Sequence, residues 1–435
     1  MILVYTGSSA SAAMGLFILF VGYLTCTAFN KKGKYHAFVL FNIVFALTTA
    51  IIIVRYDYMT FHPDTTNFFK SGIDQSRLYV ESGMASGYTS FIQLALDTFN
   101  EYYENQGYYL YLRSVAFIGN QFFDGNHEVL QLLGSSLFGC ILALVVFKIL
   151  LLYFAPRKAL SYSLIFFCLS PLLQYSVYLL RDIHITLIYA TVTYIVVTKY
   201  KPSNYPWLFI LAVTAWLVRP QHGMFTMVFI ALYYYKGSKK NAGVLIVGMV
   251  SLVAVVSIGL MNQVYDELSD TLTFYEARTG DIAKNNISFA FISKLPPPFK
   301  QIGQVVIYTF FPVNVWNQLM EGFDHPYAFI NTLMQVVSKV FWFYVMWLLL
   351  KWIMFKKALE RIDWTYKWLF AIAVVFYLLN ASDMSVRRTM CVYPMLFAMF
   401  VQTKEYYVGK RQYNKDLVMP TIFFIVTSSL YTIIK

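Results

Sequence analysis

The sequence has little charge and almost no cysteine. Asp, Glu, Lys and Arg make up 13% of its 435 residues, whereas hydrophobic residues make up 58%. This balance lies far outside the range of a soluble domain. The four cysteines, Cys26, Cys140, Cys168 and Cys391, all lie in apolar runs and have no metal-ligand spacing. We therefore expect neither a disulfide framework nor a cofactor, and the spacing gives no support to a divalent metal.

Soluble nucleotide-binding motifs are also absent. The sequence has no Gly-x-x-x-x-Gly-Lys-Ser/Thr phosphate loop, and no Gly-x-Gly-x-x-Gly follows an expected strand. The net charge of +12 could suggest nucleic acid, but the basic residues lie in short loops between apolar runs and form no soluble arm. This distribution predicts a membrane protein that binds no nucleic acid.

Long apolar runs recur along the whole chain. Each needs about 20 residues to cross a bilayer as a helix. Basic loops favour the cytoplasm, so the clusters after the first, third and later odd-numbered runs predict an orientation with both termini outside. The sequence thus predicts an all-α, polytopic transmembrane helical bundle that forms a single integral membrane domain, 1–435. About 12 spans are expected: 13–30, 36–54, 130–154, 160–180, 183–198, 205–218, 224–235, 244–261, 329–350, 368–379, 389–401 and 417–434.

Two long segments, 55–129 and 262–328, are expected to be exterior loops. The first is acidic on balance, and its aromatic faces, such as Phe91, Leu94 and Phe99, indicate interfacial helices on the membrane surface. Within the second, the apolar run at 302–316 could span the membrane or re-enter it. A full span would place the Lys351–Arg361 cluster outside, so the basic loops favour a re-entrant or interfacial segment.

The polar motifs that packing does not explain fall on the exterior side. Arg181-Asp182-Ile183-His184 and Arg219-Pro220-Gln221-His222 share an Arg-x-x-His spacing, which puts both side chains on one helix face. A guanidinium group fits a phosphate through its planar fork of donors, and a histidine can move protons near neutral pH. The alternative is that Arg181 pairs with Asp182 and both only anchor a helix end.

A carboxylate follows the second expected span, in His62-Pro63-Asp64. Asp64 would lie just above the bilayer, where it could act as general base for an acceptor hydroxyl with His62 or His222 as its partner. It could equally be the N-cap of a helix through Phe68.

Three further arginines are candidates for binding an anion. Arg387 and Arg388 enter a span from the exterior side, which is unfavourable unless they meet a phosphate, either of a substrate or of the lipid headgroups. Arg278 lies in the second exterior segment, which could be a lid or only a connector.

These motifs and their order resemble bacterial membrane glycosyltransferases of the GT-C superfamily and the related O-antigen or capsule repeat-unit polymerases. The resemblance rests on His62-Pro63-Asp64, then Leu179-Leu180-Arg181-Asp182, Leu217-Val218-Arg219-Pro220 and Arg387-Arg388-Thr389 followed by Tyr393-Pro394. It implies an exterior catalytic Asp and arginines that hold a lipid phosphate. The chain differs in that Asp64 follows the second helix, and only Arg278 lies in the long mid-chain loop.

The expected function is glycosyl transfer from polyprenyl-phosphate or -diphosphate-linked sugars during assembly of O-antigen, capsule or exopolysaccharide. Repeat-unit polymerisation and single-sugar transfer both stay open. The implied location is the bacterial inner membrane, among membrane lipids and other polysaccharide-assembly proteins. The alternative is a flippase of lipid-linked oligosaccharide, which should carry charges deep in several helices. Only Lys148 and Lys339 lie well inside apolar runs, which favours the enzyme.

Overall fold

The structure is a computed structural model of the whole chain. It describes residues 2, 6–58, 89–101, 105–126, 128–238, 295–296, 299–310, 326–355, 363–379, 389–408 and 410–434.

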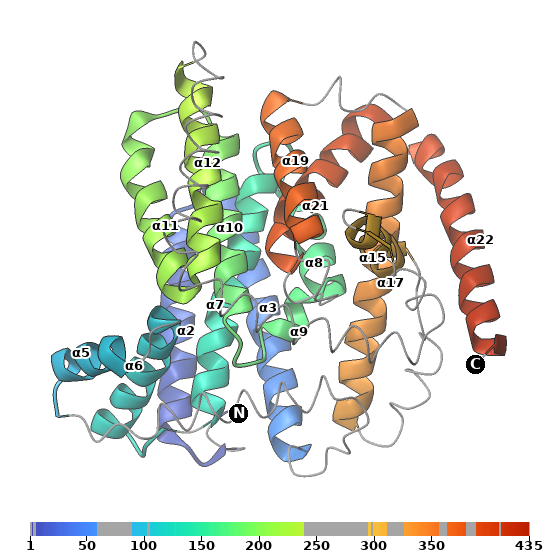
Figure 1. Ribbon diagram of the computed structural model, residues 1–435. Helices are drawn as coiled ribbons and strands as arrows, with labels where there is room; N and C mark the ends of the chain where they lie inside the picture. The colour runs from blue at the N-terminus through green and yellow to red at the C-terminus, as the bar shows by residue number, and fades with distance from the viewer. Residues whose placement is uncertain are drawn as a thin grey trace. The chain divides into compact units, whose positions relative to one another are not determined.

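The described residues form helices and connecting turns, and no strand occurs among them (Figure 1). The all-α prediction is therefore confirmed for this part of the chain. The α-helices are α2 (Ser9–Thr27), α3 (Lys31–Tyr58), α5 (Phe91–Glu101), α6 (Gln106–Phe122), α7 (Glu128–Leu150), α8 (Pro156–Leu169), α9 (Leu172–Tyr175), α10 (Asp182–Val197), α11 (Tyr205–Val218), α12 (Pro220–Ser238), α15 (Phe299–Phe310), α17 (Pro326–Phe355), α19 (Trp364–Leu379), α21 (Tyr393–Thr403) and α22 (Lys410–Ile434).

Several helices have the length and composition of membrane spans. Among the described residues, Ser9–Thr27, Lys31–Val54, Glu128–Leu150 and Phe329–Met354 are long and apolar enough to cross a bilayer. Asp182–Val197, Trp364–Tyr377 and Met390–Thr403 are shorter apolar helices. These helices are those of a membrane protein.

The chain divides into two compact units. Unit 1 comprises 1–194, 210–223 and 315–341, and unit 2 comprises 195–209, 224–314 and 342–435. Helices α10, α11, α12 and α17 contribute residues to both.

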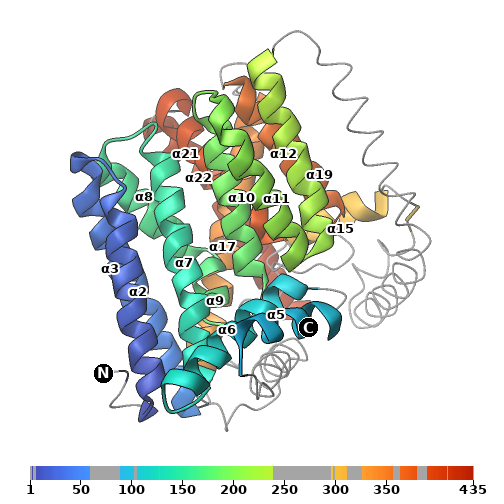
Figure 2. The ribbon, with the colours of Figure 1, turned by 90° about the vertical axis from the view of Figure 1, so that its left-hand side faces the viewer.

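The centre of unit 1 is α7, which lies beside α2 and α3 (Figure 2). Most of its residues are buried, as expected for a helix with neighbours on several sides. Gly22 allows α2 and α3 to approach closely, because a Cβ atom there would lie 2.1 Å from the Phe41 ring. At the start of α2, a small apolar cluster joins Ala10 to Val115 of α6 and Leu130 of α7.

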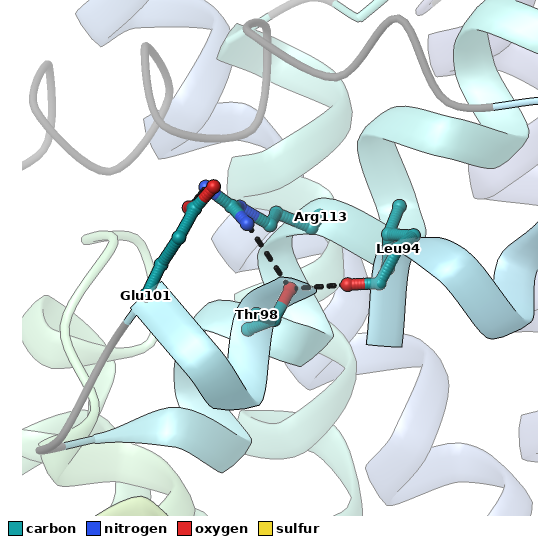
Figure 3. A network of polar contacts seen from close by, with 4 residues as sticks. All are labelled: Leu94, Thr98, Glu101 and Arg113. Carbon is teal, nitrogen blue, oxygen red and sulfur yellow. Dashed lines mark hydrogen bonds and ion pairs between the residues drawn. The ribbon is translucent and has the colours of Figure 1, made fainter. Parts of the chain in front are cut away.

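Helices α5 and α6 lie within the segment predicted as the first exterior loop. Thr98 of α5 is buried, and its hydroxyl accepts a hydrogen bond of 3.2 Å from Arg113 of α6 (Figure 3). The same guanidinium forms an ion pair with Glu101. On another face of α5, Ile92 and Leu96 are 73% and 59% exposed. The buried Arg113 therefore attaches α5 to α6 and leaves an apolar face of α5 uncovered, although Leu94, one of the residues of the expected surface face, is fully buried.

The turn between α6 and α7 supplies a cap for the N-terminus of α2. Asp124 accepts hydrogen bonds of 2.8 Å from the backbone N–H groups of Ala10 and Ser9. These donors stabilise the carboxylate, so the pKa of Asp124 is lowered to about 2. An anion at a helix N-terminus also interacts favourably with the helix dipole.

The prediction of one continuous helix over 160–180 is wrong for the second half of that range. Helix α8 ends at Leu169, and only the four residues of α9 are α-helical before α10 begins. Pro171 explains the break, because proline forces the preceding residue out of the α region. Ser170 is accordingly extended, with φ −98° and ψ 167°. A second difference is that α3 begins at Lys31, so the basic residues predicted to form a loop lie in its first turn.

The described elements of unit 2 include α19, α21, α22 and parts of α12 and α17. The carboxylate of Asp416 in α22 is almost fully buried and accepts a hydrogen bond of 2.9 Å from the indole N–H of Trp352 in α17. Lys351 Nζ lies 2.9 Å from the other carboxylate oxygen, to which Gln412 also donates. This network joins the end of α17 to the start of α22.

Candidate functional site

The two Arg-x-x-His motifs adopt the same local geometry at two helix starts in unit 1. The carbonyl oxygen of Arg181 accepts from the backbone N–H of His184 at 3.1 Å, and that of Arg219 accepts from His222 at 2.9 Å. Each arginine is thus the N-cap residue of a helix, α10 or α12, and each histidine lies in the first turn. The predicted repeat is therefore a repeat of structure, with an arginine at each positive end of a helix dipole.

The two helix starts differ in their acidic residues. The first turn of α10 contains Asp182, which is buried and whose carboxylate interacts favourably with the positive end of the helix dipole. The first turn of α12 contains no acidic residue, and Pro220 occupies its first position. Near it, Nε of Arg219 donates a long hydrogen bond of 3.3 Å to Gln221. An anion that binds at the start of α12 therefore meets no carboxylate in the first turn, whereas one that binds at the start of α10 meets Asp182.

His184 is enclosed by aromatic rings. Its ring centroid lies 4.0 Å from that of Phe138 in α7 and 5.2 Å from those of Tyr108 and Tyr111 in α6. The side chain is 5% exposed, and neither ring nitrogen bonds another side chain in the part of the chain that the structure describes, although the backbone of Leu180 interacts with the ring. A neutral imidazole has one donor and one acceptor, so at least one of its two nitrogens stays available for a further hydrogen bond.

His222 is buried as well, but it has a partner. Its Nδ1 lies 3.2 Å from the hydroxyl of Tyr189 in α10, and the two rings meet edge to face. Tyr189 thus connects the start of α12 to α10 within unit 1. A histidine held by a tyrosine hydroxyl has a fixed ring orientation, as a group that exchanges protons requires.

The segment that leads into Arg181 is buried and mostly irregular. Every residue from 170 to 180 is buried. Two of its side chains, Gln174 and Tyr178, donate to the same Oδ1 of Asn331 in α17, at 2.7 and 2.8 Å. Non-helical backbone in a membrane protein is tolerated where protein or a polar cavity surrounds it. The Asn331 contacts therefore hold the approach to Arg181 in place.

Sequence reasoning missed two groups of polar residues in unit 1. Arg113 gave no signal, because it lies alone in an aromatic stretch, yet it is 5% exposed and joins α5 to α6. Gln131 and Ser135 seemed incidental within an apolar run, but both are fully buried. An amphipathic plot of α6 could have indicated Arg113, which lies on the buried face with Leu112.

Five predicted site residues lie outside the described residues: His62, Asp64, Arg278, Arg387 and Arg388. The other five, Arg181, Asp182, His184, Arg219 and His222, lie in unit 1 at the starts of α10 and α12, which the Tyr189–His222 contact joins. The roles of all ten stay predictions. Within the described ranges, no group of three or more His, Cys, Asp or Glu side chains is placed to hold a metal ion.

Comparison with known proteins does not identify a family. No protein-family model, curated protein sequence or solved structure matches the chain. The resemblance to GT-C glycosyltransferases and repeat-unit polymerases accordingly stays a prediction from the motifs.

Proposed function

We propose that this protein is a membrane enzyme that transfers sugar from a polyprenyl-phosphate or -diphosphate carrier during cell-surface polysaccharide assembly. The observation that supports the proposal is the pair of helix starts in unit 1, each with an arginine at the N-cap and a buried histidine in the first turn. Backbone N–H groups, the helix dipole and a guanidinium fork all favour a phosphate. A buried histidine beside it can take the proton of an acceptor hydroxyl.

Arg219 is expected to contribute more to phosphate binding than Arg181, because its helix has no acid in the first turn. Lysine keeps the charge but loses the two-pronged geometry. Arg219→Lys should lower glycan production about 10–100-fold, which corresponds to the loss of a charged hydrogen bond, and Arg181→Lys should lower it less.

The assay is surface glycan in a deletion strain that carries each variant at normal membrane abundance. Arg157→Lys is the matched control, since Arg157 is an exposed arginine in the first turn of α8 on the predicted cytoplasmic side. Full glycan production with both Arg181→Lys and Arg219→Lys would reduce these residues to helix anchors. The deletion strain itself separates the two enzyme types: retention of a single repeat indicates a polymerase, and loss of one side-branch sugar indicates a single-sugar transferase.

Asp64 is our candidate for the catalytic carboxylate, with His62 or His222 as its partner. Asp64→Asn keeps the size and can still accept a hydrogen bond, so a helix cap would largely survive it. A general base typically contributes about 10²–10⁴-fold to the rate and would be lost. Normal glycan from this variant would assign Asp64 to capping and move the search to Asp182.

The proposed topology has about twelve spans in the bacterial inner membrane, exterior termini and two exterior segments with interfacial helices. Helix α15 (Phe299–Phe310) lies in the segment for which the basic loops favour a re-entrant or interfacial role. Cysteine labelling should find Gly33→Cys and Gly237→Cys cytoplasmic, and Gly87→Cys, Gly280→Cys and Ser385→Cys exterior. Exterior labelling at position 237 would contradict the topology.

One observation favours a second candidate, a flippase of lipid-linked oligosaccharide. Transporters often bind substrate where a membrane helix is interrupted, and the buried segment 170–180 interrupts the chain between α8 and α10. The two functions predict different intermediates in a deletion strain. Loss of a flippase leaves lipid-linked oligosaccharide on the cytoplasmic face, whereas loss of the enzyme leaves it on the exterior face.

A further inference from the structure

Several buried polar atoms between α6 and α7 in unit 1 have no hydrogen-bond partner among the described residues, and we refer to them as the line. On α7, Gly134, Ser135 and Phe138 lie three, four and seven residues after Gln131, so the four residues share one face. Gln131 and Ser135 are both fully buried. Gln131 Oε1 and Ser135 Oγ have no hydrogen-bond partner among the described residues.

The α6 side of this line contributes a tyrosine hydroxyl. The hydroxyl oxygen of Tyr111 lies over Gly134, 2.0 Å from where a Cβ atom of that glycine would be. Only glycine leaves room for it. The oxygen is buried and has no partner within the described ranges. The Tyr111 ring continues the line inward, 5.2 Å from both Phe138 and His184.

The outer end of the line is Asn126, in the turn between α6 and α7. Its Oδ1 accepts from Gln131 Nε2 at 2.9 Å, which makes the two side chains neighbours. Its own Nδ2 is buried without a partner in the described part of the chain. Asp124, two residues earlier, is exposed. The line therefore extends from Asn126, in the turn that contains the exposed Asp124, to Tyr111, whose ring contacts that of His184.

A set of unpaired atoms of this kind has a physical consequence. An unsatisfied buried donor or acceptor is unfavourable, because it loses its hydrogen bonds to water and gains none in the protein. Buried water commonly makes two to four hydrogen bonds to such groups. The line contains both donors and acceptors: the amide N–H₂ of Asn126, the amide oxygen of Gln131, the hydroxyls of Ser135 and Tyr111, and the imidazole of His184. Water satisfies all of them, because it donates and accepts.

We propose that the seam between α6 and α7, formed by Asn126, Gln131, Ser135, Tyr111 and His184, binds a file of water molecules that connects His184 to the aqueous surface at Asn126. Such a file allows the buried imidazole to exchange its proton with bulk water. The proposal stands on unit 1 alone and is independent of glycosyl transfer.

Two adjacent serines give a matched test. Ser135 and Ser136 are both fully buried, but the Ser136 hydroxyl lies 2.6 Å from that of Thr48, whereas Ser135 faces the seam. Each is replaced by cysteine in a full-length variant whose four native cysteines are alanine. The purified protein in nanodiscs is treated with Ag⁺, which is small and binds thiolates. Remaining thiols are counted with a fluorescent maleimide after denaturation.

Protection of the cysteine at 135 by Ag⁺, with none at 136, is the expected result. No reaction at either position means that the seam is dry and overturns the proposal. Equal reaction at both positions reports general opening of α7 and overturns it as well.

Radiolytic hydroxyl-radical labelling in H₂¹⁸O tests the native chain, so the proposal does not depend on the folding of a variant. His184 should incorporate ¹⁸O faster than Tyr233, which is fully buried and whose hydroxyl is bonded within the protein, after correction for intrinsic reactivity. Equally slow labelling of both would contradict the water file.

Discussion

Polar side chains at two places in the molecule, around Lys236 and Tyr233 in unit 2 and around His184 in unit 1, are satisfied in different ways. In unit 2, Lys236 Nζ donates to the carbonyl oxygens of Val196 and Thr198 at the end of α10, at 2.7 and 2.6 Å. The hydroxyl of Tyr233 accepts from Lys201 N at 2.7 Å and donates to Lys201 O at 2.9 Å. In unit 1, the His184 ring is buried and bonds no side chain among the described residues, and the buried hydroxyl oxygen of the partly buried Tyr111 has no hydrogen-bond partner among them.

This difference separates structural polar groups from available ones. A buried donor that bonds a helix carbonyl contributes to stability and has nothing left for a ligand. Burial, which disfavours the ammonium ion, lowers the pKa of Lys236, but the two carbonyl bonds still occupy it. A buried polar atom without a protein partner is where water or substrate can bind. We therefore expect substitutions at Lys236 and Tyr233 to affect stability, and those that remove a polar group around His184 to affect activity.

The largest effect on stability is expected for Asp416→Ala. It removes the shared acceptor of Trp352, Gln412 and Lys351. Burial alone would raise the pKa of Asp416, but the hydrogen bonds from these three side chains and the charge of Lys351 lower it below its usual value. Loss of one partner of a buried ion pair costs about 3–5 kcal/mol, and Lys351 is partly exposed, so we expect about 2–4 kcal/mol. The measurement is SDS or thermal unfolding in detergent. Asp416→Asn, which keeps an acceptor, should lose less; equal losses would contradict the charge contribution.

Gly134→Ala should destabilise unit 1 by about 1–3 kcal/mol, because the new methyl group collides with the Tyr111 hydroxyl. The double variant Gly134→Ala/Tyr111→Phe should recover part of the loss, and a double-mutant cycle measures that coupling. Additive effects would mean that the hydroxyl does not lie over Gly134.

Removal of a tyrosine hydroxyl should distinguish the two units directly. Tyr233→Phe leaves the backbone N–H of Lys201 and the Asn204 amide without their acceptor, so it should cost about 1–2 kcal/mol. Tyr111→Phe removes a hydroxyl with no protein partner among the described residues and should cost less than about 0.5 kcal/mol. Both are measured by the same unfolding assay. Equal losses of unfolding free energy in the two variants would contradict the distinction between the bonded Tyr233 hydroxyl and the Tyr111 hydroxyl.

The smallest effect concerns pH. The folded pKa of Asp124 is about 2, below the ordinary value of 3.8, so its contribution to stability is present above about pH 4 and is lost as pH falls towards 2. The apparent Tm of the native protein should therefore fall more between about pH 5 and pH 2 than that of Asp124→Asn. Parallel pH profiles would show that the α2 cap does not depend on this charge.

The sequence predicted the helix starts of the site better than the path that leads to them. The helix expected from 183 begins one residue earlier, at Asp182, whereas the helix expected from 224 begins four residues earlier, at Pro220, directly after Arg219. The break after Leu169 was missed, since an apolar run reads the same whether or not it is helical, although Ser170-Pro171 carried the signal. Gln131 and Ser135 could not be recognised, because a polar residue in an apolar run becomes informative only when its neighbours in space are known.

The Asp124 contact has a consequence for how the chain is made. The carboxylate that closes the N-terminus of α2 follows Ser9 by 115 residues. At a synthesis rate of about 5–20 residues per second, the ribosome needs roughly 6–23 s to cover that distance. Throughout this interval the first N–H groups of α2 must rely on water, headgroups or the Ser8 hydroxyl, which bonds Ser11 N at 3.1 Å. Helix α2 therefore emerges before α7 during biogenesis but acquires its finished N-terminus only as α7 begins to form.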